Sequence, residues 1–180
     1  MQRTATIILI ICALFTLTSA AFAGTPFPDV ELKGQLTAEQ KEYLGVTTDT
    51  FKVSDIKADY LFVEAFSMYC PICQRDAPKI NELFEIVLKI DTSKSIKFIG
   101  LATGNTGFET AFYQKKYGVQ FPLFEDADYV IHGALDEIGT PSFYVVRKTG
   151  STLETLFFKE GEAKDKDVLL QAIKQATGLK

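Results

Sequence analysis

The sequence predicts a single α/β domain in which helices cover both faces of a mixed β-sheet. Its 180 residues, of which 47% are hydrophobic and 23% charged, fit one globular domain. Apolar runs of strand length at residues 60–66 and 96–102 alternate with helical patterns. A hairpin pattern and a last amphipathic helix complete the chain, which contains no internal repeat and no low-complexity segment.

The first expected elements follow a proline-rich lead-in at residues 24–29. Thr37, directly ahead of Ala-Glu-Gln, is expected to cap a short helix that stops near Gly45. Residues 60–66 read Tyr-Leu-Phe-Val-Glu-Ala-Phe, an apolar run around one glutamate that is typical of a central strand buried on both faces. This strand leads directly into a pair of cysteines.

A long helix is expected from Pro71 to about residue 90, and Pro78 inside it predicts a kink. Its apolar residues recur at the spacing of one helix face, and they are Ile80, Leu83, Phe84, Val87 and Leu88. The remaining expected elements are, in chain order, a buried strand over 96–102, a helix over 108–117 ended by Gly118, a strand over 121–124, a helix over 129–138, a hairpin of strands 142–147 and 152–158, and a helix that stops at Gly178.

The charges and the possible metal ligands narrow the range of functions. Nineteen basic and twenty-three acidic residues give a net charge of -4 with no dense cluster of Lys and Arg, so we expect no nucleic-acid partner. Of the three cysteines, Cys12 lies in an apolar N-terminal stretch, which leaves Cys70, Cys73 and His132. These three cannot build a four-ligand zinc site, and we expect no metal and no cofactor.

The N-terminus has the pattern of a secretory signal peptide. A single arginine precedes an uncharged stretch with its apolar centre at residues 7–17, and Ala-Phe-Ala just before Gly24 offers a small-x-small cleavage site. We therefore predict a signal peptide at 1–23, an N-terminal extension at 24–50 and the main domain at 51–180, located in the oxidising periplasm. The alternative is an uncleaved membrane anchor, because the uncharged stretch is long enough to span a bilayer.

The chemistry is expected at Cys70-Pro71-Ile72-Cys73. A helix N-terminus stabilises a thiolate through its unpaired N–H groups and its dipole, and Cys70 lies at the predicted start of the long helix. Cys73 lies one turn further on, close enough to resolve a mixed disulfide formed by Cys70. The spacing therefore predicts a site of two-electron thiol–disulfide exchange. The alternatives are two ordinary buried cysteines or an inert disulfide, whose short loop would stabilise the fold little.

Further features at fixed distances from this pair carry a family resemblance. Pro78 follows Cys73 by five residues, Glu64 precedes Cys70 by six, Gly139-Thr140-Pro141 precedes an apolar strand, and residues 121–126 form an extra strand segment. With these features the sequence resembles the thioredoxin superfamily, and within it the secreted TlpA-like, redoxin-type thiol–disulfide oxidoreductases. The resemblance implies a thioredoxin-like fold for residues 51–180, with a mixed central sheet and helices on both faces.

The resemblance also implies roles for individual residues. Cys70 would exchange with the partner's sulfur, Cys73 would resolve the mixed disulfide, and Glu64 would carry the proton. The alternative for Glu64 is an acid whose carboxylate swings to the edge of the sheet. The Thr140–Pro141 bond is expected to be cis, against the usual preference for trans, and to lie beside the cysteines where its backbone can pair with a substrate.

The sequence departs from the family pattern next to the first cysteine. Thioredoxins carry a tryptophan there, whereas this chain has no Trp and places Met68-Tyr69 before the pair. Tyr69 can still form an aromatic wall, and together with Ile72 it is expected to contact the substrate. Pro71 and Ile72 offer a thiolate neither a charge nor a hydrogen-bond donor, which favours a reducing or intermediate potential.

The expected partners are proteins that carry thiols or disulfides, together with a membrane or secreted protein that exchanges electrons with the pair, and the chain is expected to be a monomer. Two other functions stay open. A copper-binding assembly factor would hold Cu(I) through the cysteine pair with His132 or Met68. A peroxide-reducing redoxin is the second alternative, although Ser67 stands three residues before Cys70 and the chain has no Pro-x-x-x-Thr-x-x-Cys pattern.

Overall fold

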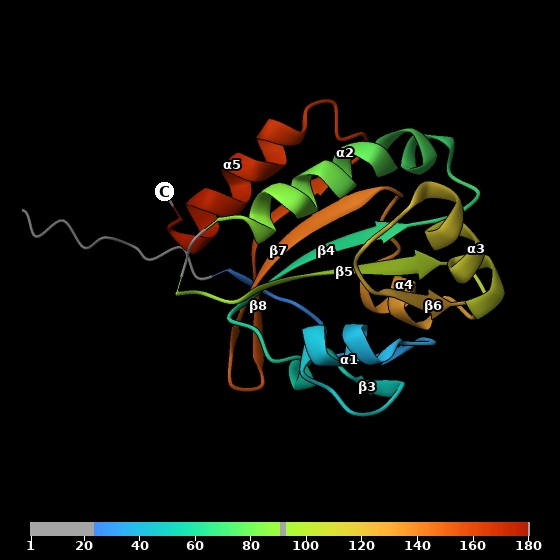
Figure 1. Ribbon diagram of the computed structural model, residues 1–180, viewed down its shortest axis with the longest axis horizontal. Coiled ribbons are helices and arrows are strands. Elements are labelled where there is room, and N and C mark those ends of the chain that lie inside the picture. The colour runs from blue at the N-terminus through green and yellow to red at the C-terminus, as the bar shows by residue number, and fades with distance from the viewer. Residues whose placement is uncertain (1–23, 91–92, 180) are drawn as a thin grey trace, which may run out of the picture.

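The computed structural model describes residues 24–90 and 93–179, and a six-stranded sheet forms their centre (Figure 1). The strands are β1 (Thr25–Pro26), β2 (Glu31–Lys33), β3 (Thr50–Lys52), β4 (Tyr60–Phe66), β5 (Ile96–Thr103), β6 (Leu123–Asp126), β7 (Ser142–Thr149) and β8 (Thr152–Glu160). The helices are α1 (Ala38–Leu44), α2 (Pro71–Leu88), α3 (Gly107–Tyr117), α4 (Val130–Ala134) and α5 (Lys166–Thr177), and one 3₁₀ turn spans Val53–Asp55.

The central sheet is mixed, as the sequence predicts. Its strand order is β1-β8-β7-β4-β5-β6. The neighbours β4, β5 and β6 run parallel to one another. The other three pairs, β4 with β7, β7 with β8 and β8 with β1, are antiparallel. A second sheet contains only the antiparallel pair β2 and β3. The carboxyl ends of the three parallel strands therefore lie side by side, and in sheets of this kind binding and catalytic residues usually lie at these strand ends.

Helices cover both faces of the sheet because β4 is apolar on both faces. Phe62 and Phe66 pack into a core with α2 and α5, whereas Leu61 and Val63 pack into a second core with α1, α4 and the β2–β3 pair. Figure 1 shows α2 and α5 on one side of the sheet and α1 with β3 on the other. Because successive side chains of a strand point to opposite faces, Glu64 points away from the Leu61 and Val63 side and into the core under α2.

Helix boundaries follow the predicted capping signals. The Thr37 hydroxyl accepts the N–H of Gln40 at 3.2 Å, and Gly45 ends α1 in the left-handed conformation with φ 70°. Gly118 ends α3 in the same way with φ 63°. Helix α2 begins at Pro71, with Cys70 as its N-cap residue.

The expected boundaries were wrong in one helix, one strand and both strands of the hairpin. The helix predicted over 129–138 is the much shorter α4, because Asp136 and Glu137 adopt φ of 60° and 54°, which ends an α-helix. The strand predicted over 121–124 begins two residues later, after Pro122, whose ring nitrogen cannot donate to a ladder. Both strands of the hairpin are two residues longer at their carboxyl ends than predicted. The extension of β7 makes the turn between the two strands shorter than predicted.

Residues 24–50 are integrated with the rest of the chain. β1 pairs with β8 at the edge of the main sheet, and β2 pairs with β3, two pairings that the sequence patterns do not predict. The predicted signal segment, residues 1–23 with Cys12, lies outside the described residues. Within 24–90 and 93–179, no helix has both the length and the apolar character needed to cross a membrane.

Candidate active site

The two cysteines of the motif occupy different environments at the start of α2. Cys70 is half-buried, and its Sγ accepts the backbone N–H of Cys73 at 3.2 Å, as an N-cap side chain does. Cys73 lies one turn further into the helix with no exposed surface. Neither thiol is in a disulfide within the described part of the chain. An incoming sulfur can therefore approach Cys70 but not Cys73.

The Gly139-Thr140-Pro141 loop lies beside Cys70. Strand pairing sets this position, because Ala65 at the end of β4 is the partner of Ser142 at the start of β7. The Thr140–Pro141 bond is cis, as expected, and the Cys70 thiol donates to the Thr140 carbonyl at 3.3 Å. Pro141 is buried and Thr140 is half-buried. The loop thus forms one wall of the space in front of the Cys70 thiol.

Glu64 lies in the interior behind the cysteines. It is only 4% exposed, and Oε1 has no hydrogen-bond partner among the described residues. Burial, together with the nearby negative charge of Asp76, raises the pKa of Glu64 to about 8. Burial and the hydrogen bond to Cys70 also raise the pKa of the Cys73 thiol above its ordinary value, and the charge of Glu64 adds to this effect. The two groups are therefore electrostatically coupled on the same face of the sheet.

Asp76 is a buried acid that the sequence reading missed. Its carboxylate accepts the N–H of Ala163 at 2.6 Å and the ammonium of Lys79 at 2.9 Å, and Lys79 also donates to the Ala163 carbonyl at 3.0 Å. These bonds tie α2 to the loop before α5. A signal was present, because Asp76 falls on the apolar stripe of α2 between Cys73 and Ile80, where a charged residue needs a partner.

Asn105 and Tyr113 were also missed, and both support the cysteine loop. Asn105 follows β5 after one glycine, and its buried amide oxygen accepts the N–H of Met68 at 2.8 Å. The Tyr113 hydroxyl, from α3, donates to the carbonyl of Cys73 at 3.0 Å. A polar residue in the short segment after a predicted buried strand was the available signal for Asn105.

The residues that flank Cys70 differ in exposure. Tyr69 is 64% exposed, and its hydroxyl donates to the Glu109 carboxylate at the start of α3. Ile72 is half-buried and Pro71 is exposed. The expected substrate contacts, Tyr69 and Ile72, are therefore both available at the surface beside the thiol.

His132 has a structural contact in α4. Its Nε2 lies 2.9 Å from the carbonyl oxygen of Ile138, and its ring packs edge-on against Tyr129. In the part of the chain that the structure describes, no three His, Cys, Asp or Glu side chains are grouped as metal ligands would be.

Comparisons with known proteins match most of the chain. The AhpC/TSA family matches residues 23–154. The thiol-disulfide oxidoreductase ResA of Bacillus subtilis (strain 168) is 23% identical over 159 residues, covering 86% of this chain and 82% of that protein. Among solved structures, a putative thiol:disulfide interchange protein DsbE from Chlorobium tepidum has a TM-score of 0.66 at 18% identity, covering 86% of this chain and 96% of that chain.

A second solved structure, a secreted Mycobacterium tuberculosis disulfide oxidoreductase homologous to E. coli DsbE, has a TM-score of 0.61 at 18% identity and covers 82% of this chain and 96% of that chain. The matches confirm the thioredoxin-like fold class. They also confirm the resemblance to redoxin-type thiol–disulfide oxidoreductases.

Proposed function

The chain belongs to the AhpC/TSA family and is a thioredoxin-like thiol–disulfide oxidoreductase, and on this premise we propose that Cys70 and Cys73 form its redox-active pair. The observation that carries the proposal is the asymmetry of the pair. Cys70 is accessible at the N-cap of α2 beside the Thr140 carbonyl, whereas Cys73 is fully buried one helical turn behind it. An attacking thiol and a protected resolving thiol require this arrangement.

Exchange proceeds in two displacements that conserve atoms and electrons. The Cys70 thiolate attacks one sulfur of a partner disulfide, which breaks that S–S bond and releases the other partner sulfur as a thiolate that takes up a proton. Cys73 then loses its proton and attacks the Cys70 sulfur, which releases the second partner thiol. The Cys70–Cys73 pair is oxidised by two electrons and the partner is reduced by two, so the sulfurs alone carry the chemistry without a cofactor or metal.

We propose that Glu64 carries the proton of the second displacement. The Cys73 thiol is hard to ionise because burial raises its pKa, so its attack needs a base. Ionised Glu64 accepts this proton, and in the reverse reaction protonated Glu64 returns it to the Cys73 thiolate. Since burial raises the pKa of Glu64 to about 8, both forms are accessible near neutral pH.

The Thr140–Pro141 loop is proposed to align the partner. An extended partner segment that pairs with the Thr140 backbone would hold its disulfide next to Cys70, in the manner of strand addition. Tyr69 and Ile72 would contact the same segment, because both reach the surface beside the thiol. The absence of a charge or donor at Pro71 and Ile72 supports a reducing or intermediate potential.

The compartment and partners complete the proposal. Residues 1–23 act as a signal peptide that delivers the chain to the periplasm, with a membrane anchor as the alternative, followed by an extension at 24–50 and the thioredoxin-like domain at 51–180. There the chain works as a monomer on protein thiols and disulfides, and a membrane or secreted protein renews its redox state. N-terminal sequencing of the protein recovered from periplasm distinguishes cleavage from anchoring.

Reduction of insulin tests the redox role directly. The reduced protein, supplied with electrons from dithiothreitol, is expected to cleave the insulin disulfides and precipitate the B chain, followed as turbidity. Cys70→Ser should remove this activity, and reduced Cys73→Ser, assayed after the dithiothreitol has been removed, should stop after one displacement with an insulin chain attached to Cys70. Unchanged turnover in Cys70→Ser would show that the pair is not the redox centre.

A further inference from the structure

Exposed apolar side chains gather at the edge of the sheet that holds the cysteines. At the carboxyl ends of β4, β5 and β6, the large apolar side chains with high exposure are Tyr69, Phe108, Phe112, Tyr129 and Val130. Among the described residues, the others of this kind are spread over α2, β8 and α5, and they are Leu88, Phe158 and Val168. Clustered exposed apolar groups mark an interaction surface more often than scattered ones do.

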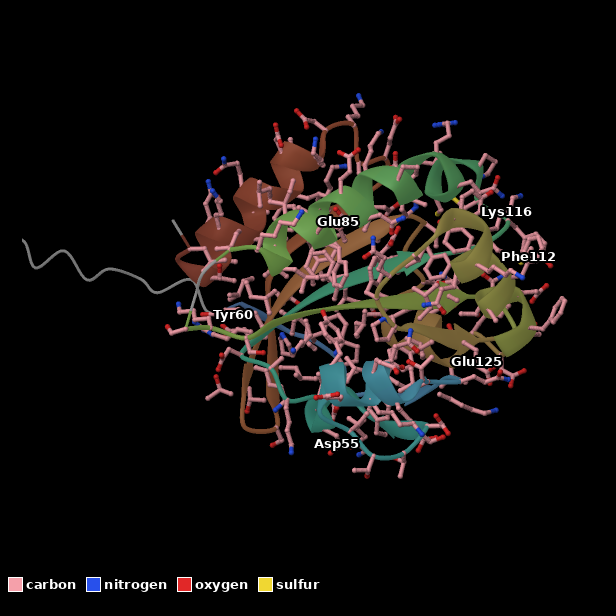
Figure 2. The ribbon with its side chains drawn as sticks, in the orientation of Figure 1. Asp55, Tyr60, Glu85, Phe112, Lys116 and Glu125 are labelled. Atoms are coloured by element: carbon pink, nitrogen blue, oxygen red, sulfur yellow. The ribbon has the colours of Figure 1, made fainter. Side chains whose placement is uncertain are left out.

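The outer side of α3 carries two of these groups, including Phe108, the most exposed of them. Phe108 and Phe112 are 81% and 49% exposed, and their spacing of four residues places them on one helix face. Lys115 and Lys116 continue this side, and the Lys116 ammonium lies 5.8 Å from the centre of the Phe112 ring. Figure 2 shows Phe112 and Lys116 projecting from α3 at the margin of the molecule, away from the sheet.

This side of α3 is continuous with the reactive thiol. Tyr69, the residue before Cys70, donates its hydroxyl to Glu109, which lies between Phe108 and Phe112 in the first turns of α3. On the inner side of the same helix, the Tyr113 hydroxyl donates to the Cys73 carbonyl at 3.0 Å. A molecule seated against Tyr69 therefore lies against both Cys70 and the start of α3.

We propose that Tyr69, Phe108, Phe112, Lys115 and Lys116, here called the aromatic face, dock the protein whose disulfide exchanges with Cys70. The partner presents an apolar side chain to the two phenylalanines and a carboxylate to the lysines, close to its own cysteine. This inference rests on the proposed redox function and names the partner chemistry of that site. The phenylalanines and lysines are specificity residues, since they touch the partner but not the reacting sulfurs.

The position of the aromatic face favours a redox partner over the other possible occupants. A second copy of the chain or a lipid surface seated on Tyr69 and α3 would cover Cys70 and exclude the disulfides with which it must react. A partner protein has to bring its sulfur into bonding range of Cys70, so contact with the adjacent aromatic face follows from the reaction itself.

Two short peptides test the proposal. Each carries one cysteine in a mixed disulfide with thionitrobenzoate; the first has Phe and Glu near the cysteine, and the second has Ser and Gln in their places. The Cys70 thiolate attacks the peptide sulfur, the S–S bond breaks, and coloured thionitrobenzoate leaves as a thiolate. Cys73 then displaces the peptide as a thiol and closes the Cys70–Cys73 disulfide. The symmetric disulfide of 2-mercaptoethanol, which has no ring, no charge and no docking segment, reports the reactivity of Cys70 alone through the loss of protein thiols.

The wild-type protein is expected to react about tenfold faster with the Phe/Glu peptide, which equals about 1.4 kcal/mol of docking energy. The double variant Phe108→Ser/Phe112→Ser should lose this preference. The double variant Lys115→Glu/Lys116→Glu should lose the part of the preference that comes from the glutamate in the peptide. Leu88→Ser, an exposed apolar residue at the far end of α2, is the matched control and should keep the preference. All four proteins should react equally with the symmetric disulfide, which also confirms that they fold.

Equal wild-type rates for the two peptides, with normal reaction of the symmetric disulfide, would overturn the docking proposal and leave the redox function intact. No reaction with the symmetric disulfide would instead overturn the redox function. A wild-type dimer that becomes a monomer in Phe108→Ser/Phe112→Ser would assign the aromatic face to a second copy. Binding of wild-type protein to phosphatidylglycerol vesicles that the same variant loses would assign it to a lipid surface, and either result overturns the proposal.

Discussion

Replacing Glu64 by glutamine should change how the stability of the protein depends on pH. The carboxyl group has a pKa of 4.5 when it is unperturbed, whereas burial raises it to about 8 in the folded chain. Between these two values the folded protein keeps a proton that the unfolded chain has released, so the free energy of unfolding falls as the pH rises. At about 1.4 kcal/mol for each pKa unit, the full loss across this window is on the order of 5 kcal/mol.

Glutamine cannot release a proton, so the variant should not show this loss. Below pH 4.5 the two proteins should be of similar stability, and the variant should become steadily more stable than wild type as the pH approaches about 8. Urea unfolding of the reduced proteins at several pH values in this window measures the difference. Glu85→Gln, which removes a negative charge from the exposed side of α2 (Figure 2), is the matched control.

Parallel stability curves for wild type and Glu64→Gln across the window would refute the assignment of a buried, protonated Glu64. The same variant should also slow the second displacement, since a positioned base typically contributes about 100-fold or more to a proton transfer. Rapid-quench detection of the mixed disulfide on Cys70 measures that step. A resolution rate equal to that of wild type would remove Glu64 from the mechanism even if the stability result holds.

The other predictions concern single residues. Iodoacetamide should label Cys70 before Cys73 in the reduced protein, because Cys73 is fully buried, and peptide mass spectrometry after brief labelling would show the reverse order if the roles are exchanged. Asp76→Ala should lower the free energy of unfolding by about 3 kcal/mol, because it leaves the buried N–H of Ala163 without an acceptor, and unchanged urea stability would contradict this. Thr37→Ala should cost about 1 kcal/mol through loss of the α1 cap, whereas an unaltered thermal midpoint would mean that the cap contributes nothing.

Elements with a strong burial pattern could be predicted from the sequence. β4 was predicted over residues 60–66 because a strand buried on both faces is a continuous apolar run, and α2 because its buried residues recur at helical spacing. α4 ended early because the positive φ of Asp136 and Glu137 leaves no trace in the apolar spacing. β1, β2 and β3 are two or three residues long, too short to carry a period.

The candidate site likewise contains residues that the sequence predicts and contacts that it does not. Cys70, Cys73, Glu64 and the Thr140–Pro141 bond have fixed spacings or a family resemblance that point to them, and the fold brings the cysteines and the loop together at the end of β4. Supporting contacts such as Asp76 with Ala163 join positions far apart in the chain. A sequence can reveal that a buried polar residue needs a partner, but the choice of partner depends on how the elements pack.

Equilibrium redox titration measures directly whether Cys70 and Cys73 form a redox-active pair. The protein is equilibrated at a series of dithiothreitol or glutathione ratios, the remaining thiols are trapped by alkylation, and peptide mapping locates any disulfide. We expect one reversible two-electron transition, with a tenfold change in the ratio for about every 30 mV, and a disulfide that joins Cys70 to Cys73. A pair that stays reduced at every ratio, or a transition that persists in Cys70→Ser, would contradict this expectation.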